Sequence, residues 1–388
     1  MADFIIQLMN FSRMKFWLCF GRCGTWPAVP LPQPAIAQSR QTRQNPSMQF
    51  GLYVTQPNAL AGSRELAQSR DHALEPLPPG AVDSQYALGH AVLLEADRVG
   101  FDLILFAERH LGPDIAAWVM ASAIGAQTTH IRNMIAIHPG LWHPAMVAKL
   151  AASLDRICPG RMAINIVAGW NEREFRMYGG EVMLDDDARR YARAKEFIDI
   201  LRGLWTRTPY SLDGEFYKIN ASELLLKPAT PTPPEIFAAA RTSVGLDMVA
   251  EAADWWFVDY PKTVVDTGEV EVALRAKMAD VSARAARRGR KVRFGFNPFI
   301  AFGDSPESAM ETTYRRLLEF EPGADTRLIQ SRLSPPMKAG GIGPPKKVLD
   351  QMRRYRDMGI ELLLLKFFPT VEETRRIAEE IIEPMRTR

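Results

Sequence analysis

Two segments of the chain combine hydroxyl, guanidinium and backbone N–H groups in a way that suits a phosphate group. Thr242 and Ser243 stand where a helix is predicted to begin, and the first N–H groups of a helix have no partner within it. In most proteins a Thr or Ser at this position is only a helix cap. Arg190, followed by Tyr191 near the start of another predicted helix, can complement a phosphate dianion with its planar guanidinium, although in isolation a surface arginine is the commoner role. Together the two segments predict a site for a phosphate.

Histidines gather in one part of the chain. Four of the six lie between residues 110 and 143, and His110 and His138 follow predicted strand ends. An imidazole titrates near neutral pH, so either ring can donate a proton or orient a reactive group; a hydrogen-bonded structural role is equally expected for each. No carboxylate or cysteine stands at the spacing of a known metal motif, so we predict no metal site. A serine-type triad is disfavoured because no Gly-x-Ser-x-Gly motif occurs.

One apolar run contains a polar residue, Asn165, whose amide is costly to bury unless it finds a partner. The turn Gly169-Trp170 and then Glu174 follow this run. A polar side chain near a strand end, followed by such a turn, is typical of a ligand site in a barrel enzyme.

Short apolar runs alternate regularly with longer amphipathic stretches from Met48 onward. The predicted strands are 50–54, 103–106, 134–137, 163–167, 236–239, 255–258, 292–301 and 362–365. The predicted helices are 84–99, 114–127, 144–157, 189–204, 243–252, 268–288, 305–320, 345–358 and 371–386.

Eight strand–helix pairs in one chain predict a (β/α)8 TIM barrel with insertion loops at its C-terminal face. A doubly wound open sheet gives the same alternation, but its Gly-x-Gly-x-x-Gly is absent after the first strand, where the chain reads Thr55-Gln56-Pro57-Asn58. Active sites of such barrels lie where the strands end, which adds Glu108 and Arg109 to the candidates. Insertions are expected at 56–83, at 206–234 with a hairpin-like turn, and at 322–344, a candidate lid.

The composition is that of an ordinary globular enzyme. The chain has 388 residues, is 47% hydrophobic and carries a net charge of +3, which gives no reason to expect a polyanionic partner. The basic run 284–291 is interpreted as a solvated helix end rather than a nucleic-acid site. Three cysteines favour a reducing, cytoplasmic setting, and no apolar run approaches the ~18 residues of a membrane span.

The first 47 residues differ from the rest. Their apolar segment is short and is followed by a stretch rich in proline, glutamine and arginine. A secretory signal is one interpretation, but a disordered extension or a wrongly assigned start, with Met48 as the functional start, is favoured. We therefore expect residues 1–47 to be an extension and residues 48–388 to form the barrel.

The chain resembles the bacterial luciferase-like flavin monooxygenases from about Met48 to the C-terminus. The residues that carry this resemblance are Leu154-Asp155-Arg156, Gly160-Arg161, Asn165 to Trp170, Glu174-Phe175 and Arg190-Tyr191. The resemblance implies a (β/α)8 barrel that takes reduced FMN from a separate NAD(P)H-dependent flavin reductase. In such enzymes the flavin reacts with O2 to give a C4a-(hydro)peroxide, and one oxygen atom goes to the substrate. Relatives are commonly dimers or tetramers, and the same is expected here.

Site residues follow from the resemblance by position. It implies that FMN contacts Glu108, Arg109, Asn165, Glu174, Arg190, Tyr191 and Thr242. Beside such a flavin, His110 and His138 are the candidates to donate to or orient the peroxide, because imidazole titrates near working pH. The FMN phosphate would rest at Arg190-Tyr191 and Thr242. The family usually has Gly-Gly-Ser-Ser where this chain reads Ala239-Ala240-Arg241-Thr242, which makes the approach to the flavin more crowded.

The motifs indicate the family more clearly than they indicate its branch, and the substrate depends on the branch. The chain is similar to the dimethyl sulfone, alkanesulfonate and pyrimidine monooxygenases, and a sulfone or sulfonate is expected. It lacks the Arg-x-His of the alkanesulfonate branch on the seventh strand, where Asn297-Pro298-Phe299 looks more like the dimethyl sulfone branch. Two alternatives stay open: a deazaflavin (F420)-dependent oxidoreductase of the same fold, and a flavin-binding protein without turnover.

Overall fold

The computed structural model describes residues 48–54, 76–111, 114–169, 171–178, 186–259, 261, 266–320, 335 and 337–387. The expected extension 1–47 lies outside these residues, as do most of the insertion 56–83 and most of the candidate lid 322–344. No helix of the described part is long and apolar enough to cross a membrane.

Eight parallel strands close into a barrel. Around the barrel they follow the order β1-β12-β9-β8-β7-β4-β3-β2, and neighbouring strands pair in parallel throughout. The strands are β1 (Gln49–Val54), β2 (Leu103–Phe106), β3 (Arg132–Ile137), β4 (Met162–Val167), β7 (Glu235–Ala239), β8 (Trp255–Val258), β9 (Arg293–Phe296) and β12 (Leu362–Leu365). The predicted (β/α)8 barrel is thus confirmed.

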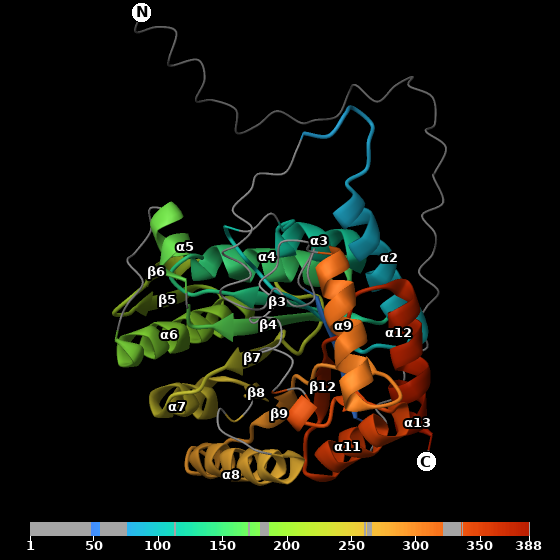
Figure 1. Cartoon of the computed structure of the whole chain (residues 1–388). Helices are drawn as coiled ribbons and strands as arrows, with labels where there is room; N and C mark the ends of the chain where they lie inside the picture. Colours follow the sequence, from blue (N-terminus) through green and yellow to red (C-terminus); the bar gives the residue numbers. More distant parts are fainter. Residues whose placement is uncertain are drawn as a thin grey trace, which may run out of the picture. The chain divides into compact units, whose positions relative to one another are not determined.

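Helices lie around the outside of the barrel (Figure 1). They are α2 (Ser84–Val99), α3 (Ala117–Gly125), α4 (Pro144–Ile157), α6 (Asp187–Thr206), α7 (Ser243–Ala252), α8 (Thr267–Ala286), α11 (Pro345–Asp357) and, at the C-terminal end, α12 (Val371–Ile377), the π-helical turn η2 (Ala378–Ile382) and α13 (Glu383–Arg386). Their starts follow from local sequence: the Asp186 carboxylate accepts the Ala188 N–H at the start of α6, and Thr242 accepts the Gly245 N–H at the start of α7.

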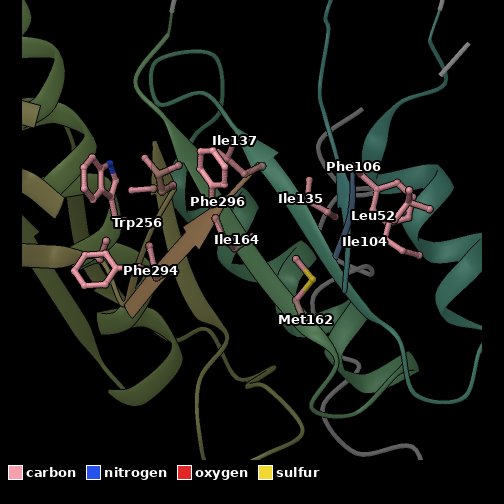
Figure 2. Close-up of a cluster of buried hydrophobic side chains, with 14 of the residues drawn as sticks. Leu52, Ile104, Phe106, Ile135, Ile137, Met162, Ile164, Trp256, Phe294 and Phe296 are labelled. Carbon is pink, nitrogen blue, oxygen red and sulfur yellow. The ribbon is translucent and has the colours of Figure 1, made fainter. Parts of the chain in front are cut away.

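Alternate residues of the strands supply two separate cores. Outward-facing side chains pack under the helices, as Figure 2 shows for Leu52, Ile104, Phe106, Ile135, Ile137, Met162, Ile164, Trp256, Phe294 and Phe296. Inward-facing side chains fill the barrel with a smaller cluster: Leu103, Leu105, Met134, Ala136, Ala163, Phe237, Trp255, Phe257, Leu362 and Leu364. Because these side chains fill the interior of the barrel, a ligand site is expected at the carboxyl ends of the strands.

The predicted strand 292–301 is wrong in its second half. β9 ends at Phe296, because Pro298 has no N–H to continue a strand ladder. The chain then contacts β12 through Lys366, whose N–H donates to Pro298 O (3.0 Å), and pairs as β10 (Ala301–Phe302) with β11 (Ile342–Gly343). The short β10–β11 pair lies beside α9 (Pro306–Phe320).

The second insertion contains the expected hairpin. Strands β5 (Tyr210–Asp213) and β6 (Lys218–Ser222) are antiparallel, and the Glu196 carboxylate on α6 accepts the N–H groups of Glu215, Phe216 and Tyr217 in the turn. The predictions did not include α5 (Glu172–Met177), a short helix between β4 and α6.

Candidate active site at the carboxyl ends of the strands

Asn165 points into the barrel. It lies on the same face of β4 as Ala163, which belongs to the inner core, whereas Ile164 and Ile166 on the opposite face belong to the outer one. Its side chain is 4% exposed, and among the described residues its Oδ1 has no hydrogen-bond partner. The Oδ1 atom of Asn297, directly after β9, is also buried and has no hydrogen-bond partner among the described residues. Buried amide oxygens of this kind are costly unless a partner donates to them, so both suit a ligand that carries N–H or O–H groups.

Arg109 is neutralised by a neighbouring carboxylate. Its Nε and Nη2 donate to the two oxygens of Asp114, at 2.6 and 2.5 Å, and both side chains are largely buried. This bidentate pair fixes the loop after β2. The loop carries the candidates on either side of Arg109, Glu108 and His110.

Glu108 can hold a proton near neutral pH. Its Oε2 accepts the N–H of Ala117, the first residue of α3, at 3.1 Å. Burial, together with the nearby charges of Asp114 and Glu174, raises the pKa of Glu108 to about 7, although the hydrogen bond from Ala117 acts to lower it. A carboxyl group with this pKa is suited to exchange protons at working pH.

His110 and His138 form a pair. His138, at the end of β3, is 3% exposed, and its Nδ1 lies 3.4 Å from His110 Nε2. Burial lowers the pKa of His110 to about 4; burial and the neighbouring His110 lower the pKa of His138 to about 3. Both rings are therefore neutral at pH 7, and one imidazole N–H can bridge them. The ring of His110 also meets Trp142 and Tyr178, with centroids 6.2 and 5.2 Å away.

Helix α5 brings Glu174 to this histidine pair. Asn171 caps the helix by accepting the N–H of Arg173 at 3.2 Å. The Glu174 carboxylate is 2% exposed and accepts the backbone N–H of His110 at 3.1 Å. Burial raises its pKa. Glu108, His110, His138 and Glu174 are thus gathered at the carboxyl ends of β2, β3 and β4.

The two predicted phosphate segments meet at a second place. Arg190 and Tyr191 lie in the first two turns of α6, where Arg190 forms an ion pair with Asp187. The Tyr191 ring packs on Gly245 in the first turns of α7: a Cβ at Gly245 would lie 2.6 Å from Tyr191 Cζ. The Gly245 N–H donates to Thr242 Oγ1 at 3.3 Å. The N-terminus of α7 and Arg190-Tyr191 are therefore neighbours, the arrangement that an anion site needs.

Comparison with known proteins identifies the family of this barrel. The Luciferase-like monooxygenase family matches residues 68–362, which is more than half of the chain. The chain belongs to that family. The expected family is confirmed, and the protein is a monooxygenase of the luciferase-like class.

The relatives of this luciferase-like monooxygenase are named for different activities. An FMNH(2)-dependent dimethylsulfone monooxygenase of Pseudomonas putida is 28% identical over 291 residues, 69% of this chain and 77% of its own. The structure of a riboflavin lyase with modified FMN and riboflavin superposes with a TM-score of 0.68 at 15% identity, covering 88% of this chain and 91% of its own. The structure of an F420-dependent secondary alcohol dehydrogenase superposes with a TM-score of 0.62 at 17% identity, covering 87% of this chain and 99% of its own. At these identities the two structures show a shared fold only.

Several residues of the candidate site escaped prediction. Asp114 was not paired with Arg109, and Tyr178 directly follows the unpredicted α5. The capping pattern Asn171-x-x-Glu174 is the signal that could have shown this helix. Trp170, in the turn that was expected to border a ligand site, is outside the described residues. His143 lies apart from the pair, since its ring caps α4 by accepting the Ala145 N–H at 3.3 Å. Within the described ranges no three His, Cys, Asp or Glu side chains are grouped to hold a metal ion.

Proposed function

We propose that this luciferase-like monooxygenase uses reduced FMN, delivered by an NAD(P)H-dependent flavin reductase, to transfer one oxygen atom of O2 to a small organosulfur substrate. The observation that carries the proposal is the junction of α6 and α7. There Arg190 directly precedes Tyr191, whose ring packs on Gly245, and Thr242 caps the same end of α7, so a guanidinium, a hydroxyl and helix N–H groups are available for a phosphate.

The partnerless Oδ1 of Asn165 supports a flavin in particular. Among the described residues this buried oxygen lacks a donor, and the isoalloxazine ring has an N–H to offer. Bound reduced FMN supplies the two electrons that activate O2; one oxygen atom enters the substrate and the other leaves as water. The chain's own part is to hold protons at His110, His138 and Glu108, and to exclude water around them.

A sulfone suits the described part of the site better than a sulfonate does. The two imidazoles near the proposed reaction centre are neutral at pH 7, and the charge of Arg109 is balanced by Asp114. An anionic sulfonate would need a cation there, whereas the oxygens of a neutral sulfone need only hydrogen-bond donors. The 28% identity to the dimethylsulfone monooxygenase of Pseudomonas putida points the same way.

The test is an anaerobic titration of the purified protein with reduced FMN and, separately, with reduced F420, followed by O2 and dimethyl sulfone. The proposal expects tight binding of reduced FMN and one product molecule for each O2 consumed. Preference for F420 with hydride transfer and no O2 uptake would replace it with the deazaflavin alternative, whose fold is shared by the alcohol dehydrogenase. FMN binding without product from sulfones, sulfonates or pyrimidines would leave a flavin-binding protein.

A further inference from the structure

Arg193 is a charged residue buried completely inside the protein. It lies on α6, three residues after Arg190, and is 0% exposed. Burying a guanidinium costs several kcal/mol, and apolar residues of similar size often serve stability as well or better. Stability alone is therefore a poor reason for an arginine here.

The guanidinium of Arg193 lies against Gly140 in the loop after β3. A Cβ at Gly140 would be 2.5 Å from Arg193 Cζ, 2.6 Å from Nη1 and 2.7 Å from Nη2. Because the three distances are nearly equal, the flat face of the guanidinium covers Gly140. The glycine is required twice, since its φ of +98° also disfavours any other residue.

The same guanidinium contacts helix α5. Arg193 Cζ lies 5.7 Å from the ring centroid of Phe175, a cation–π distance. The Phe175 ring in turn packs on Gly169 after β4, where a Cβ would lie 2.9 Å from Phe175 Cζ. Arg193 thus joins α6 to the segments that follow β3 and β4.

Both segments carry a member of the histidine site. Gly140 is the middle of a turn closed by the N–H groups of Leu141 and Trp142, which donate to His138 O at 3.1 and 3.4 Å. Phe175 directly follows Glu174, whose carboxylate holds the backbone of His110. One side chain therefore supports both histidines, from the helix whose first turn carries Arg190.

We propose that Arg193 is a positioning residue that holds the His138 turn and the Glu174 helix in register with the phosphate end of the bound flavin. Its role in turnover rests on the proposed function. Its role in ordering the two segments does not, so the two can be tested apart.

The first measurement needs no cofactor: backbone hydrogen–deuterium exchange of the native protein, Arg193→Met and Arg202→Met. Arg202 lies on the same helix and pairs with Asp254, so it is the matched control. We expect Arg193→Met to keep a cooperative melting transition and to speed exchange at His110, Leu141 and Trp142, by about tenfold or more. Arg202→Met leaves these amides unchanged. Equal exchange in all three proteins overturns the proposal.

The second measurement is turnover with reduced FMN and dimethyl sulfone. In Arg193→Met we expect kcat and the yield of product per O2 to fall by about tenfold or more, with the balance appearing as hydrogen peroxide, while KM and FMN affinity change by less than about threefold. Arg193→Lys restores the charge without the flat face and is expected to show the same defect; full rescue by lysine would contradict the geometry. If native protein does not turn over, the proposed function fails and the exchange result stands alone.

A variant that fails to fold does not end the test. Phe175→Leu keeps the guanidinium and removes only its aromatic neighbour. We expect faster exchange at the His110 amide and a smaller loss of product yield. Native behaviour of Phe175→Leu in both measurements, together with an unfolded Arg193→Met, would assign Arg193 to the core alone.

Discussion

His138 Nδ1 lies 3.4 Å from His110 Nε2, and the two rings meet edge to face at the carboxyl ends of β2 and β3. Both imidazoles are neutral at pH 7 because burial lowers their pKa values. A neutral pair of this kind can pass a single proton along the bridge, whereas two charged rings would repel each other.

Replacement of His138 by Asn is expected to separate binding from chemistry. Reduced FMN should still bind, because the proposed phosphate contacts lie on α6 and α7, but the yield of product per O2 should fall by about 100-fold, the usual scale of a lost proton donor. His143→Asn serves as the control, since that ring caps α4 and meets Tyr217 rather than His110 or His138. Product formation in His138→Asn equal to that of the native protein would remove His138 from the mechanism.

The His110–His138 pair is also expected to make the free energy of unfolding depend on pH. In the unfolded chain a histidine binds a proton below pH ~6.5, whereas the folded pKa of His138 is about 3. Between these values the unfolded state binds more protons, so stability falls as the pH falls. Between pH 7 and pH 5.5, urea unfolding should show that the native protein loses about 1 kcal/mol more stability than His138→Asn does. A loss of the same size in native and variant protein would show that His138 titrates normally.

Glu108 should change the stability of the protein with pH in the opposite direction to His138. Its folded pKa is raised to about 7, so between its ordinary pKa near 4.5 and pH 7 the folded state binds more protons, and stability falls as the pH rises. Glu108→Gln cannot titrate and should gain stability over the native protein across this window, on the order of 2 kcal/mol at pH 7. Glu95 offers a contrast, because its hydrogen bonds from Arg98 and Arg375 lower its pKa to about 2. Glu95→Gln should lose stability above pH 4.5; the same sign for both variants would refute the Glu108 assignment.

Much of the barrel could be predicted because the spacing of apolar residues within each segment indicates a strand or a helix. β2, β8, β12, α2, α4 and α7 begin and end where the apolar pattern does. The error at 292–301 arose because Asn297-Pro298-Phe299 continues the apolar character of β9 while Pro298 breaks its hydrogen bonding. Apolar character persists beyond a strand whenever the chain stays buried.

The candidate site was predictable residue by residue but not in its contacts. Polar residues at strand ends gave Glu108, His110, His138 and Asn165, since the barrel brings all strand ends to one face. The pairing of Arg109 with Asp114 and the packing of Arg193 on Gly140 depend on side chains that meet only in the folded chain. Nothing in the spacing of residues 140 and 193 signals that contact.

Gly245 tests the contact between α6 and α7. Alanine in a helix is ordinarily more stable than glycine by about 0.5–1 kcal/mol. At Gly245 its Cβ would lie 2.6 Å from Tyr191 Cζ and 2.9 Å from the Cβ of Ala240, so we expect a loss of about 1–3 kcal/mol and weaker FMN binding. Gly268→Ala, in the first turn of α8, is the control because its closest contact is 3.3 Å. Stabilisation by Gly245→Ala, measured by urea unfolding, would mean that Tyr191 moves aside without cost.

Arg190 can be tested with two ligands that differ only in the phosphate. We expect Arg190→Met to weaken FMN binding by about 10- to 100-fold, as loss of a charge-assisted hydrogen bond does, and to leave riboflavin binding unchanged. The neighbouring Arg189 is more exposed and pairs with Glu215 on the hairpin, so Arg189→Met should affect neither ligand. Fluorescence titration of both variants with both ligands gives the comparison. Equal weakening of FMN and riboflavin by Arg190→Met would place the phosphate elsewhere, because the arginine would then contribute to the shape of α6 rather than to the recognition of charge.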